Sequence, residues 1–526
     1  MPSTLQRLPA IPASKKAAPH ASAEVRTLID DLIAEQKTLQ TPIARYSDYH
    51  DTEPDLAPHY RTLIPLSKPG DGEQYAFEVS LDRCTGCKAC VSACHSLNGL
   101  DDEEAWRDVG MIHGGRKTPG WQQTITTACH HCEDPGCMNG CPVGAYEKDS
   151  DTGIVRHLDD QCIGCSYCIL KCPFDVPKYS KKRGIVRKCD MCHQRLAEGE
   201  APACVQSCPT EAIRIVKVKT GTSAVAPDFL PGAPDPTITL PTTRYVGRDV
   251  PESAVAADRE SLVPEHAHWP LVLMLMLTQA GVGMLTGGLG NVVTTILANV
   301  LFFAGMGASI LHLGQPLKAW RFFLGLRTSW LSREILAFSM FAPIPMVLAA
   351  LPFVPDFPYK DLITRVTTLS ALPIGLIAVF TSVMIYHDTH RTSWRFRLTA
   401  GRFFGTVATF ASLGNLLAHP SPLATLLFAI GVIAKLIPEV RIVHLALDRN
   451  AEWSSDLHTA RIQWGPLRLI YDSRVLLAIA AIAFSLLNPW IALPLLLAAE
   501  LFERQLFFQS VHAPKMPGSF GPKRAH

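Results

Sequence analysis

All sixteen cysteines of this 526-residue chain lie between Cys84 and Cys208, in four successive groups of four. The groups are Cys84, Cys87, Cys90 and Cys94; Cys129, Cys132, Cys137 and Cys141; Cys162, Cys165, Cys168 and Cys172; and Cys189, Cys192, Cys204 and Cys208. The first and third groups have the spacing C-x2-C-x2-C-x3-C, and a proline follows the last cysteine of the second, third and fourth groups. This spacing is typical of bacterial ferredoxins and predicts four [4Fe-4S] clusters with all sixteen thiolates as ligands.

Two other uses of cysteine fit this pattern less well. A structural zinc site is built from two C-x2-C pairs and has no use for a third and fourth cysteine in the same run. Disulfide scaffolds are usually short and secreted, whereas residues 1–20 lack the apolar run and the twin arginine of an export signal. In two-cluster ferredoxins the fourth cysteine of a run binds the other cluster, so we expect the groups to work in pairs.

The chain combines a polar half, residues 1–265, with a mostly apolar half, residues 270–511. We expect an N-terminal extension with an amphipathic helix (1–75), an α+β ferredoxin-like domain with the clusters (76–220), a proline-rich linker (221–268), a membrane anchor (269–511) and a basic tail (512–526). The helix, within residues 22–40, either packs on its own domain or docks a partner subunit. The net charge of +2 does not favour nucleic-acid binding, which needs a basic surface.

The anchor contains apolar segments of the length that a membrane-spanning helix needs, about 20 residues. The first six are 270–288, 291–312, 335–354, 366–386, 403–419 and 422–440. A further apolar stretch between Arg474 and Glu500 is interrupted by Asn488-Pro489, so it is either one long helix or a hairpin. The hairpin would complete an all-α polytopic bundle of eight helices.

The distribution of basic residues favours eight helices over seven. With eight, the loops on one side carry Lys318, Arg321, Arg327, Arg333, Arg391, Arg395, Arg397, Arg402, Arg441, Arg449, Arg461, Arg468, Lys515, Lys523 and Arg524. The loops on the other side carry Lys360 and Arg365. Basic loops face the cytoplasm in most membrane proteins. We therefore expect a multi-pass protein of the inner membrane whose cluster domain faces the cytoplasm.

Charged and small residues inside the spans predict different roles. Lys435 and Glu439 are four residues apart in one segment and are expected to pair with each other. Glu500 has no such local partner, and an ionisable residue in a span usually marks function or a pair. Gly283 and Gly287 have the small-xxx-small spacing that lets membrane helices pack closely.

Electrons are expected to pass between the clusters and a quinone at the membrane surface. The histidines of the anchor lie at or beyond the predicted helix ends, so we expect no haem. A quinone site needs an apolar slot and a group that binds and exchanges protons near the membrane edge. His312 and Glu334 flank the loop between the second and third segments, and Lys318 lies on it. For His312, a purely interfacial position is the alternative.

The residues resemble a known family. The cluster domain is similar to the DmsB-like iron-sulfur subunits of the dimethyl sulfoxide reductase superfamily, and the anchor resembles the DmsC type in residues 312–318, 329–334, 384–386 and 503–508. The resemblance implies a quinol site at His312, Lys318 and Glu334. It also implies nested cluster ligands: Cys84, Cys87, Cys90 with Cys208; Cys189, Cys192, Cys204 with Cys94; Cys129, Cys132, Cys137 with Cys172; Cys162, Cys165, Cys168 with Cys141.

This resemblance implies an electron-transfer and anchoring subunit, itself non-catalytic, between a molybdopterin catalytic subunit and quinone in the lipid. The fusion of the electron carrier with the anchor, and the cytoplasmic position expected for the cluster domain, look most like the Soe-type sulfite dehydrogenase branch. The catalytic partner subunit is therefore expected to oxidise sulfite or to carry out a DMSO-type reduction. A stand-alone ferredoxin:quinone oxidoreductase and an ion-translocating redox module are the alternatives. Copurification of a large molybdopterin protein would separate the first hypothesis from the second.

Overall fold

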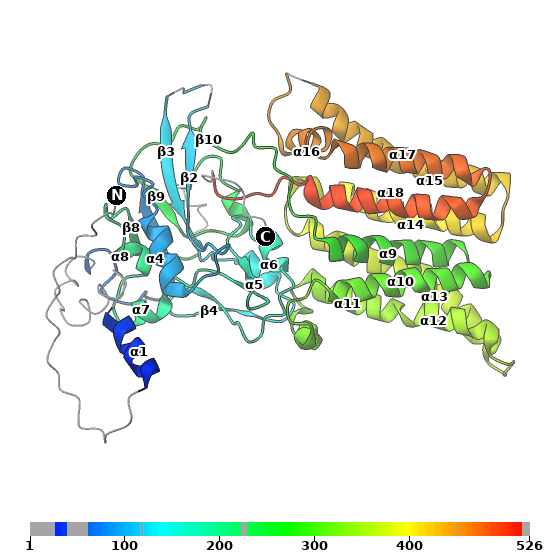
Figure 1. The fold of residues 1–526 in the computed structure, drawn as a ribbon, viewed down its shortest axis with the longest axis horizontal. Helices are drawn as coiled ribbons and strands as arrows, with labels where there is room; N and C mark the ends of the chain where they lie inside the picture. The colour runs from blue at the N-terminus through cyan, green and yellow to red at the C-terminus, as the bar shows by residue number, and fades with distance from the viewer. Residues whose placement is uncertain are drawn as a thin grey trace. The chain divides into compact units, whose positions relative to one another are not determined.

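The computed structural model describes residues 27–38, 61–115, 117–118, 120–221, 229–448 and 450–517. The chain forms two compact units, Met1–His59 and Tyr60–His526. In the first, helix α1 (Leu28–Thr38) confirms the helix expected within residues 22–40. The predictions for residues 1–20, Arg449 and most of the basic tail lie outside the described residues. The second unit contains a domain of short strands and helices and a bundle of long helices (Figure 1).

The cluster domain is built on two small three-stranded sheets. In the first sheet, β1 (Glu73–Ser80) lies between β8 (Ile213–Lys219) and β9 (Arg244–Val246); in the second, β2 (Asp108–His113) lies between β3 (Gln122–Thr127) and β10 (Val255–Ala256). Two hairpins follow the second and third cysteine groups: β4 (Tyr146–Lys148) with β5 (Val155–His157), and β6 (Lys178–Ser180) with β7 (Ile185–Arg187). The sheets and hairpins surround the cysteine loops.

The segment 221–268 does more than link the two domains. Strand β9 pairs in parallel with β1, with Arg244 opposite Glu78, and β10 pairs antiparallel with β2, with Val255 opposite His113. Residues 244–256 therefore belong to the cluster domain, and the expected boundary at residue 220 is too early. Glu260, Ser261 and Glu265 contact the anchor. The prolines of this segment correctly indicated extended chain, but an extended chain can also complete a sheet edge, and the partner strands lie more than 100 residues away in sequence.

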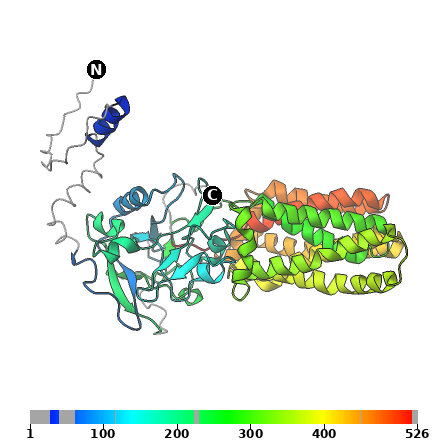
Figure 2. The same cartoon turned by 90° about the horizontal axis from the view of Figure 1, so that it is seen from below.

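The anchor is a bundle of long helices that lie side by side in both views (Figures 1 and 2). They are α9 (Trp269–Gly287), α10 (Val292–Ile310), α11 (Trp330–Phe341) continued by α12 (Pro343–Ala350), α13 (Lys360–His387), α14 (Phe396–Ala418), α15 (Pro422–His444), α17 (Arg468–Ser485) and α18 (Pro489–Gln509), with a short α16 (Ser455–Trp464). Within the described residues, five segments are long and apolar enough to cross a membrane: Trp269–Gly287, Val292–Ile310, Trp330–Phe353, Lys360–His387 and Pro422–Leu447.

The last two helices form the hairpin that was one of two sequence alternatives. Helix α17 ends at Ser485 and α18 begins at Pro489, and the Asn488 side chain caps α18 by accepting a hydrogen bond from the Trp490 amide at 2.9 Å. Proline is well tolerated at the first position of a helix because that residue needs no amide hydrogen. The polar cap and the proline therefore turn the apolar stretch back on itself.

Two glycines of α9 allow a close approach of α14. A Cβ atom on Gly287 would lie 1.8 Å from the carbonyl oxygen of Ala411, and one on Gly283 would lie 2.3 Å from that of Val407. Any larger side chain would push the two backbones apart. The prediction that this small-xxx-small pair serves close helix packing is confirmed.

The loops rich in basic residues contact the cluster domain. Arg321 Nη1 donates a hydrogen bond to the Asp160 carbonyl at 3.0 Å, and the Gln315 amide donates to the Ile163 carbonyl at 3.0 Å. Lys360 begins α13 at the opposite end of that helix from His387 and pairs with Asp356. The cluster domain is therefore on the basic side of the bundle, as the charge distribution indicated.

Candidate functional site

The four cysteine groups fold into similar loops. In each group the residue two positions after the first cysteine has a positive φ between 41° and 72°; these residues are Gly86, His131, Gly164 and Met191. In the last three groups the backbone amide of this residue donates a hydrogen bond to the Sγ atom of the first cysteine, with N–Sγ distances of 3.3 to 3.5 Å. Hydrogen bonds to sulfur stabilise a thiolate that binds iron. The left-handed turn, which is costly for His131 and Met191, thus aims backbone donors at the predicted ligands.

One pocket in the cluster domain has cysteines from two groups in its wall. It is lined by Cys129, Cys132 and Cys137 of the second group and by Cys172 of the third. Three thiols from one run and one from another are the donor set of a ferredoxin-type [4Fe-4S] cluster, so these residues fit such a group. Among the described residues, no three His, Cys, Asp or Glu side chains lie close enough together to bind a single metal ion.

Three buried side chains lie between the cysteine groups and reveal their order. Arg107 interacts with thiols of the first and fourth groups. Lys188 interacts with thiols of the fourth and second groups, and its Nζ atom lies 3.5 Å from Cys129 Sγ. Tyr146 interacts with thiols of the second and third groups. The groups therefore follow one another in space as first, fourth, second and third.

The thiols are buried, and buried cations beside them offset their negative charge. Burial, together with the charges of Cys204 and Cys192, raises the pKa of the Cys94 thiol to about 12. Burial alone would lower the pKa of Lys188, but the nearby thiols raise it, so this side chain stays charged. Lys188 and Arg107 thus offset negative charge at the cysteine loops. Sequence reasoning missed both residues. The position of Lys188 directly before Cys189 was an available signal, but its contact with Cys129, 59 residues away, depends on the fold.

The third cysteine group contacts the long helices of the anchor. Helix α6 (Tyr167–Lys171) lies within this group. Tyr167 donates a hydrogen bond to the Ile385 carbonyl at 3.1 Å, and Lys171 Nζ lies 2.8 Å from Asp388 Oδ2 at the end of α13. The second cysteine group also contacts the anchor, because the Gly325 amide donates to the Pro142 carbonyl, next to Cys141, at 2.9 Å. The series of cysteine groups therefore ends against the membrane helices.

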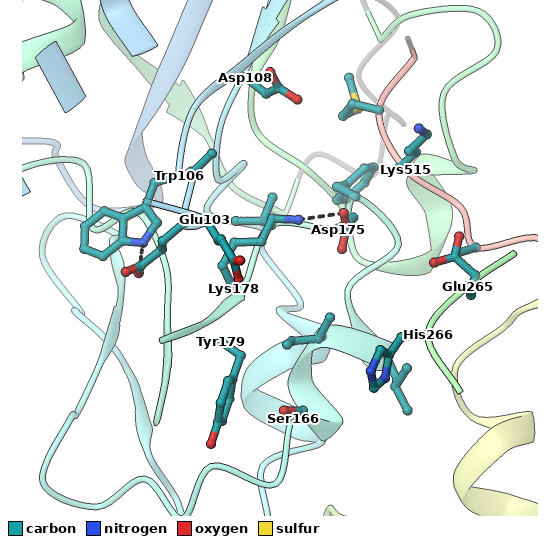
Figure 3. Close-up of a pocket in the computed structure, with 18 of the residues that line it drawn as sticks. Glu103, Trp106, Asp108, Ser166, Asp175, Lys178, Tyr179, Glu265, His266 and Lys515 are labelled. Carbon is teal, nitrogen blue, oxygen red and sulfur yellow. Dashed lines mark hydrogen bonds and ion pairs between the residues drawn. The ribbon is translucent and has the colours of Figure 1, made fainter. Parts of the chain in front are cut away.

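A cavity of about 1200 Å³ opens beside this junction (Figure 3). Cys165 and Ser166 of the third group line it, together with His266 from the chain that enters α9 and with His312. Figure 3 shows Ser166 and His266 on its lower side and the Lys178–Asp175 ion pair, 2.6 Å long, across its upper part. Burial lowers the pKa of His312 to about 4, so this side chain is neutral at ordinary pH.

The structure separates the three predicted quinone-site residues. Glu334 lies in the second turn of α11, is 3% exposed, and accepts a hydrogen bond from the Ser382 hydroxyl of α13. It does not line the cavity, and neither does Lys318, which lies in the 3-10 segment Pro316–Gly325. The third helix begins at Trp330 rather than 335, which carries Glu334 into the bundle. His312 is therefore the candidate that faces the cavity, and Glu334 is a separate buried acid.

The expected pair of Lys435 and Glu439 is wrong. Lys435 pairs with Glu500 of α18, and Glu439 lies 3.3 Å from Arg474 of α17. Glu500 is thus partnered as well, through helices that are distant in sequence. Sequence reasoning compared residues within one helix and had no signal for these contacts between helices.

Comparison with known proteins identifies the family. Residues 121–218 match the family model described as a 4Fe-4S dicluster domain, and residues 265–509 match that of the DMSO reductase anchor subunit, DmsC. The probable anaerobic dimethyl sulfoxide reductase chain YnfG of Escherichia coli K12 is 40% identical over 168 residues, which are 29% of this chain and 82% of the relative. The chain belongs to the dimethyl sulfoxide reductase family. It joins an iron-sulfur electron-transfer subunit and a DmsC-type multi-pass membrane anchor in one polypeptide.

Two further relatives agree with this assignment of the cluster region. The B subunit of the anaerobic dimethyl sulfoxide reductase of Escherichia coli K12 is 42% identical over 148 residues, or 27% of this chain and 72% of the relative. The iron-sulfur subunit of the nitrate-inducible formate dehydrogenase of the same organism is 34% identical over 169 residues, or 28% of this chain and 57% of the relative. The predicted family and the predicted class of function are therefore confirmed.

Proposed function

We propose that this chain holds four [4Fe-4S] clusters and carries electrons between a molybdopterin catalytic subunit and quinone in the membrane. The observation that carries the proposal is the docking of Tyr167 and Lys171, within the third cysteine group, on α13. This contact puts one end of the series of groups at the lipid-facing domain. When bound, the clusters accept and donate single electrons. Cys87, in the first group at the other end, is exposed and is suited to face the catalytic partner.

The nested ligand pairs are part of this proposal. The pocket lined by Cys129, Cys132, Cys137 and Cys172 supports one pair of groups. The mutual electrostatic effects of Cys94 with Cys192 and Cys204, of Cys90 with Cys208, and of Cys165 with Cys141 support the rest. We assign Cys84, Cys87, Cys90 and Cys208 to the cluster nearest the partner, and Cys162, Cys165, Cys168 and Cys141 to the one at the membrane.

Quinone is proposed to react at the membrane junction. His312 supports this because it lines the same cavity as Cys165 and is neutral, so it can donate a hydrogen bond to a quinone oxygen. Glu334 is proposed as the proton-exchanging acid, since it is buried close to the Tyr167 side chain. Lys318 is proposed as an outer contact of the quinone and contributes less, because it does not line the cavity.

The anchor is proposed to span the inner membrane eight times with the cluster domain in the cytoplasm. Helices α14, α17 and α18 have 23, 18 and 21 residues and lie beside the five apolar spans. The charged residues deeper in these helices, Arg474, Glu500, Glu503 and Arg504, are buried between helices, whereas the exposed Arg397 and Arg468 lie in the first turns of α14 and α17. The excess of basic residues on the cluster side supports the cytoplasmic orientation.

The test combines iron analysis with quinone exchange. Four clusters require ~16 iron atoms per chain, and stoichiometric zinc would overturn the proposal. In the reduced full-length protein, His312→Ala and Glu334→Gln should leave all cluster signals intact and block reoxidation by a short-chain quinone. His419→Ala, an exposed histidine at the opposite end of the bundle, is the matched control and should react normally. Normal reoxidation in both the His312 and the Glu334 variants would move the site elsewhere.

A further inference from the structure

Seven charged side chains of the anchor form one connected cluster between helices α14, α15, α17 and α18, which we call the charged network. Its members are Arg402, Lys435, Glu439, Arg474, Glu500, Glu503 and Arg504. Six of them are at most 5% exposed. Ionisable groups inside a membrane domain are costly to bury and usually have a function.

Ion pairs connect the network from one end to the other. Arg402 Nε lies 3.7 Å from Glu503 Oε1, and Arg504 Nη1 lies 2.5 Å from Glu503 Oε2. Lys435 joins Glu503, at 3.9 Å, to Glu500. Glu503 is therefore the carboxylate that three of the four cations share.

A branch leads away from Glu503 and ends within the protein. Arg474 Nη2 lies 3.0 Å from Glu500 Oε1 and 3.3 Å from Glu439 Oε1. Glu439 makes no further ion pair among the described residues. The branch thus ends at Glu439, whereas Glu503 pairs with Arg402 on one side and with Lys435 and Arg504 on the other.

One end of the network reaches the surface on the side of the cluster domain. Arg402 is 12% exposed and lines a small pocket together with Ser393, Asp456, Thr459 and Ser510. These four side chains are polar and lie at the cluster-side ends of their helices or in the adjoining loops. The apolar side chains of Trp394, Leu398, Ile442 and Phe507 complete the lining of this pocket. Water at this surface can therefore reach Arg402 past the polar side chains, and Arg402 pairs with Glu503.

The other end approaches the proposed quinone site. Arg504 donates hydrogen bonds to Gln279 at 2.5 Å and to Thr406 at 2.9 Å. Tyr386 of α13 interacts electrostatically with both Arg504 and Glu334. Ser382, which donates to Glu334, lies one helical turn before Tyr386. The Tyr386 ring also contacts the rings of Phe403 and Phe507, over which the Arg504 guanidinium lies, so Tyr386 connects the network to the buried acid.

The network stops near the middle of the bundle. Glu503 lies six residues before the end of α18 and Lys435 nine residues before the end of α15, or about 9 and 14 Å below the cluster-side ends at 1.5 Å per residue. Residues 407–418, 423–434, 475–485 and 489–499, which form the remaining halves of the four helices, contain no charged side chain. The network therefore communicates with the cluster side alone and does not form a route across the bilayer.

Several buried atoms of the network have no hydrogen-bond partner among the described residues. They are Arg474 Nε and Nη1, Arg504 Nε, Glu500 Oε1, Glu503 Oε1 and the Nε2 atom of the adjoining Gln279. Within the part of the chain that the structure describes, the two carboxylate oxygens make only the ion pairs with Arg474 and Arg402 given above. A purely structural ion-pair cluster would be expected to satisfy such atoms, because each unsatisfied one is costly. Polar atoms in this arrangement suit internal water, which also conducts protons.

We propose that one part of the charged network, from Arg402 through Glu503 to Arg504, together with Tyr386, is the proton path between water on the cluster side and Glu334. The branch that ends at Glu439 is not part of this path. The proposal rests on the proposed function, in which quinone reacts near Glu334. Reduction of one quinone takes two electrons from the clusters and two protons through this path, and quinol oxidation returns both. The guanidinium groups remain charged, so they orient water and hold the carboxylate of Glu503, which exchanges the proton.

The experiment uses the full-length protein in liposomes, with reduced clusters mixed rapidly with a short-chain quinone. Glu503→Gln and Tyr386→Phe should slow cluster reoxidation about a hundredfold, the scale of losing one positioned proton-transfer group. Affinity for a tight-binding quinone analogue should stay at the wild-type value. Glu439→Gln is the matched control, since it is an equally buried carboxylate at the end of the branch, and it should keep the wild-type rate. Millimolar acetate should restore the rate of Glu503→Gln.

The outcomes separate this path from the quinone site. A wild-type rate in Glu503→Gln while Glu334→Gln is blocked would refute the path and keep the site; wild-type rates in both would refute the site. Equal slowing in Glu439→Gln and Glu503→Gln without rescue by acetate would make the network structural and overturn the proposal. If Glu503→Gln does not fold, Arg402→Gln at the partly exposed entry must slow reoxidation, and a wild-type rate there would also overturn it.

Discussion

Replacing Lys188 by methionine should lower the reduction potentials of the two middle clusters. Its Nζ atom is buried, lies 3.5 Å from Cys129 Sγ, and donates to the Cys189 carbonyl at 2.9 Å. A reduced cluster carries one more negative charge than an oxidised one, so a nearby cation favours the reduced state. Methionine keeps the length of the side chain and removes the charge. The expected shift is therefore negative.

The size of this shift follows from the geometry. At about 6 Å from the ammonium to the arriving electron and an effective dielectric constant of about 20, the Coulomb energy is about 2.8 kcal/mol, or ~120 mV for one electron. Because Lys188 borders the second and fourth groups, the two clusters of these groups should share the effect. The clusters of the first and third groups should change little.

The assay is a redox titration of the purified protein followed by electron paramagnetic resonance. Lys182→Met is the control, since its side chain is 74% exposed and 3.8 Å from Asp101, and solvent screens such a surface charge. Unchanged potentials in Lys188→Met, or a shift confined to the clusters of the first and third groups, would refute the inferred order of the groups.

Three further predictions concern the anchor. Gly287→Leu should force α9 away from α14, because a Cβ would already lie 1.8 Å from the Ala411 carbonyl oxygen. We expect a loss of about 1–3 kcal/mol of stability in thermal unfolding. Gly307→Ala should be neutral, because a Cβ at that position would meet no atom within 4 Å. The pKa of His312 is lowered to about 4, so unfolding binds a proton between about pH 6.5 and 4. Stability should fall as the pH drops through this range, and His312→Gln should remove that part of the decline. A reporter fused after His526 should be active in the cytoplasm, and a periplasmic signal would contradict the proposed topology.

The sequence predicted those features that depend on local spacing. Cysteine runs determine where a cluster can bind, because the ligands of one loop are separated by two or three residues. Uninterrupted apolar length predicted most spans closely, and Asn488-Pro489 marked the hairpin as one of two possibilities. The loop charges correctly put the cluster domain on the basic side, as the contact of Arg321 with Asp160 shows.

Other features depended on contacts between residues far apart in the chain. The pairs of Lys435 with Glu500 and of Arg474 with Glu439 join three helices, and the local pairing rule gave the wrong partner. The positions of Lys188 beside Cys129 and of β9 beside β1 have no sequence signal for the same reason.

The sequence by itself determined that this chain binds iron-sulfur clusters and crosses a membrane, since ligand spacing and apolar length are properties of short segments. The tertiary structure alone decided the order of the cysteine groups, the docking of Tyr167 on α13, the separation of His312 from Glu334 and the assembly of the charged network. The physical reason is that packing brings together side chains from elements hundreds of residues apart. Their partners are chosen by helix and sheet geometry, which no single segment contains.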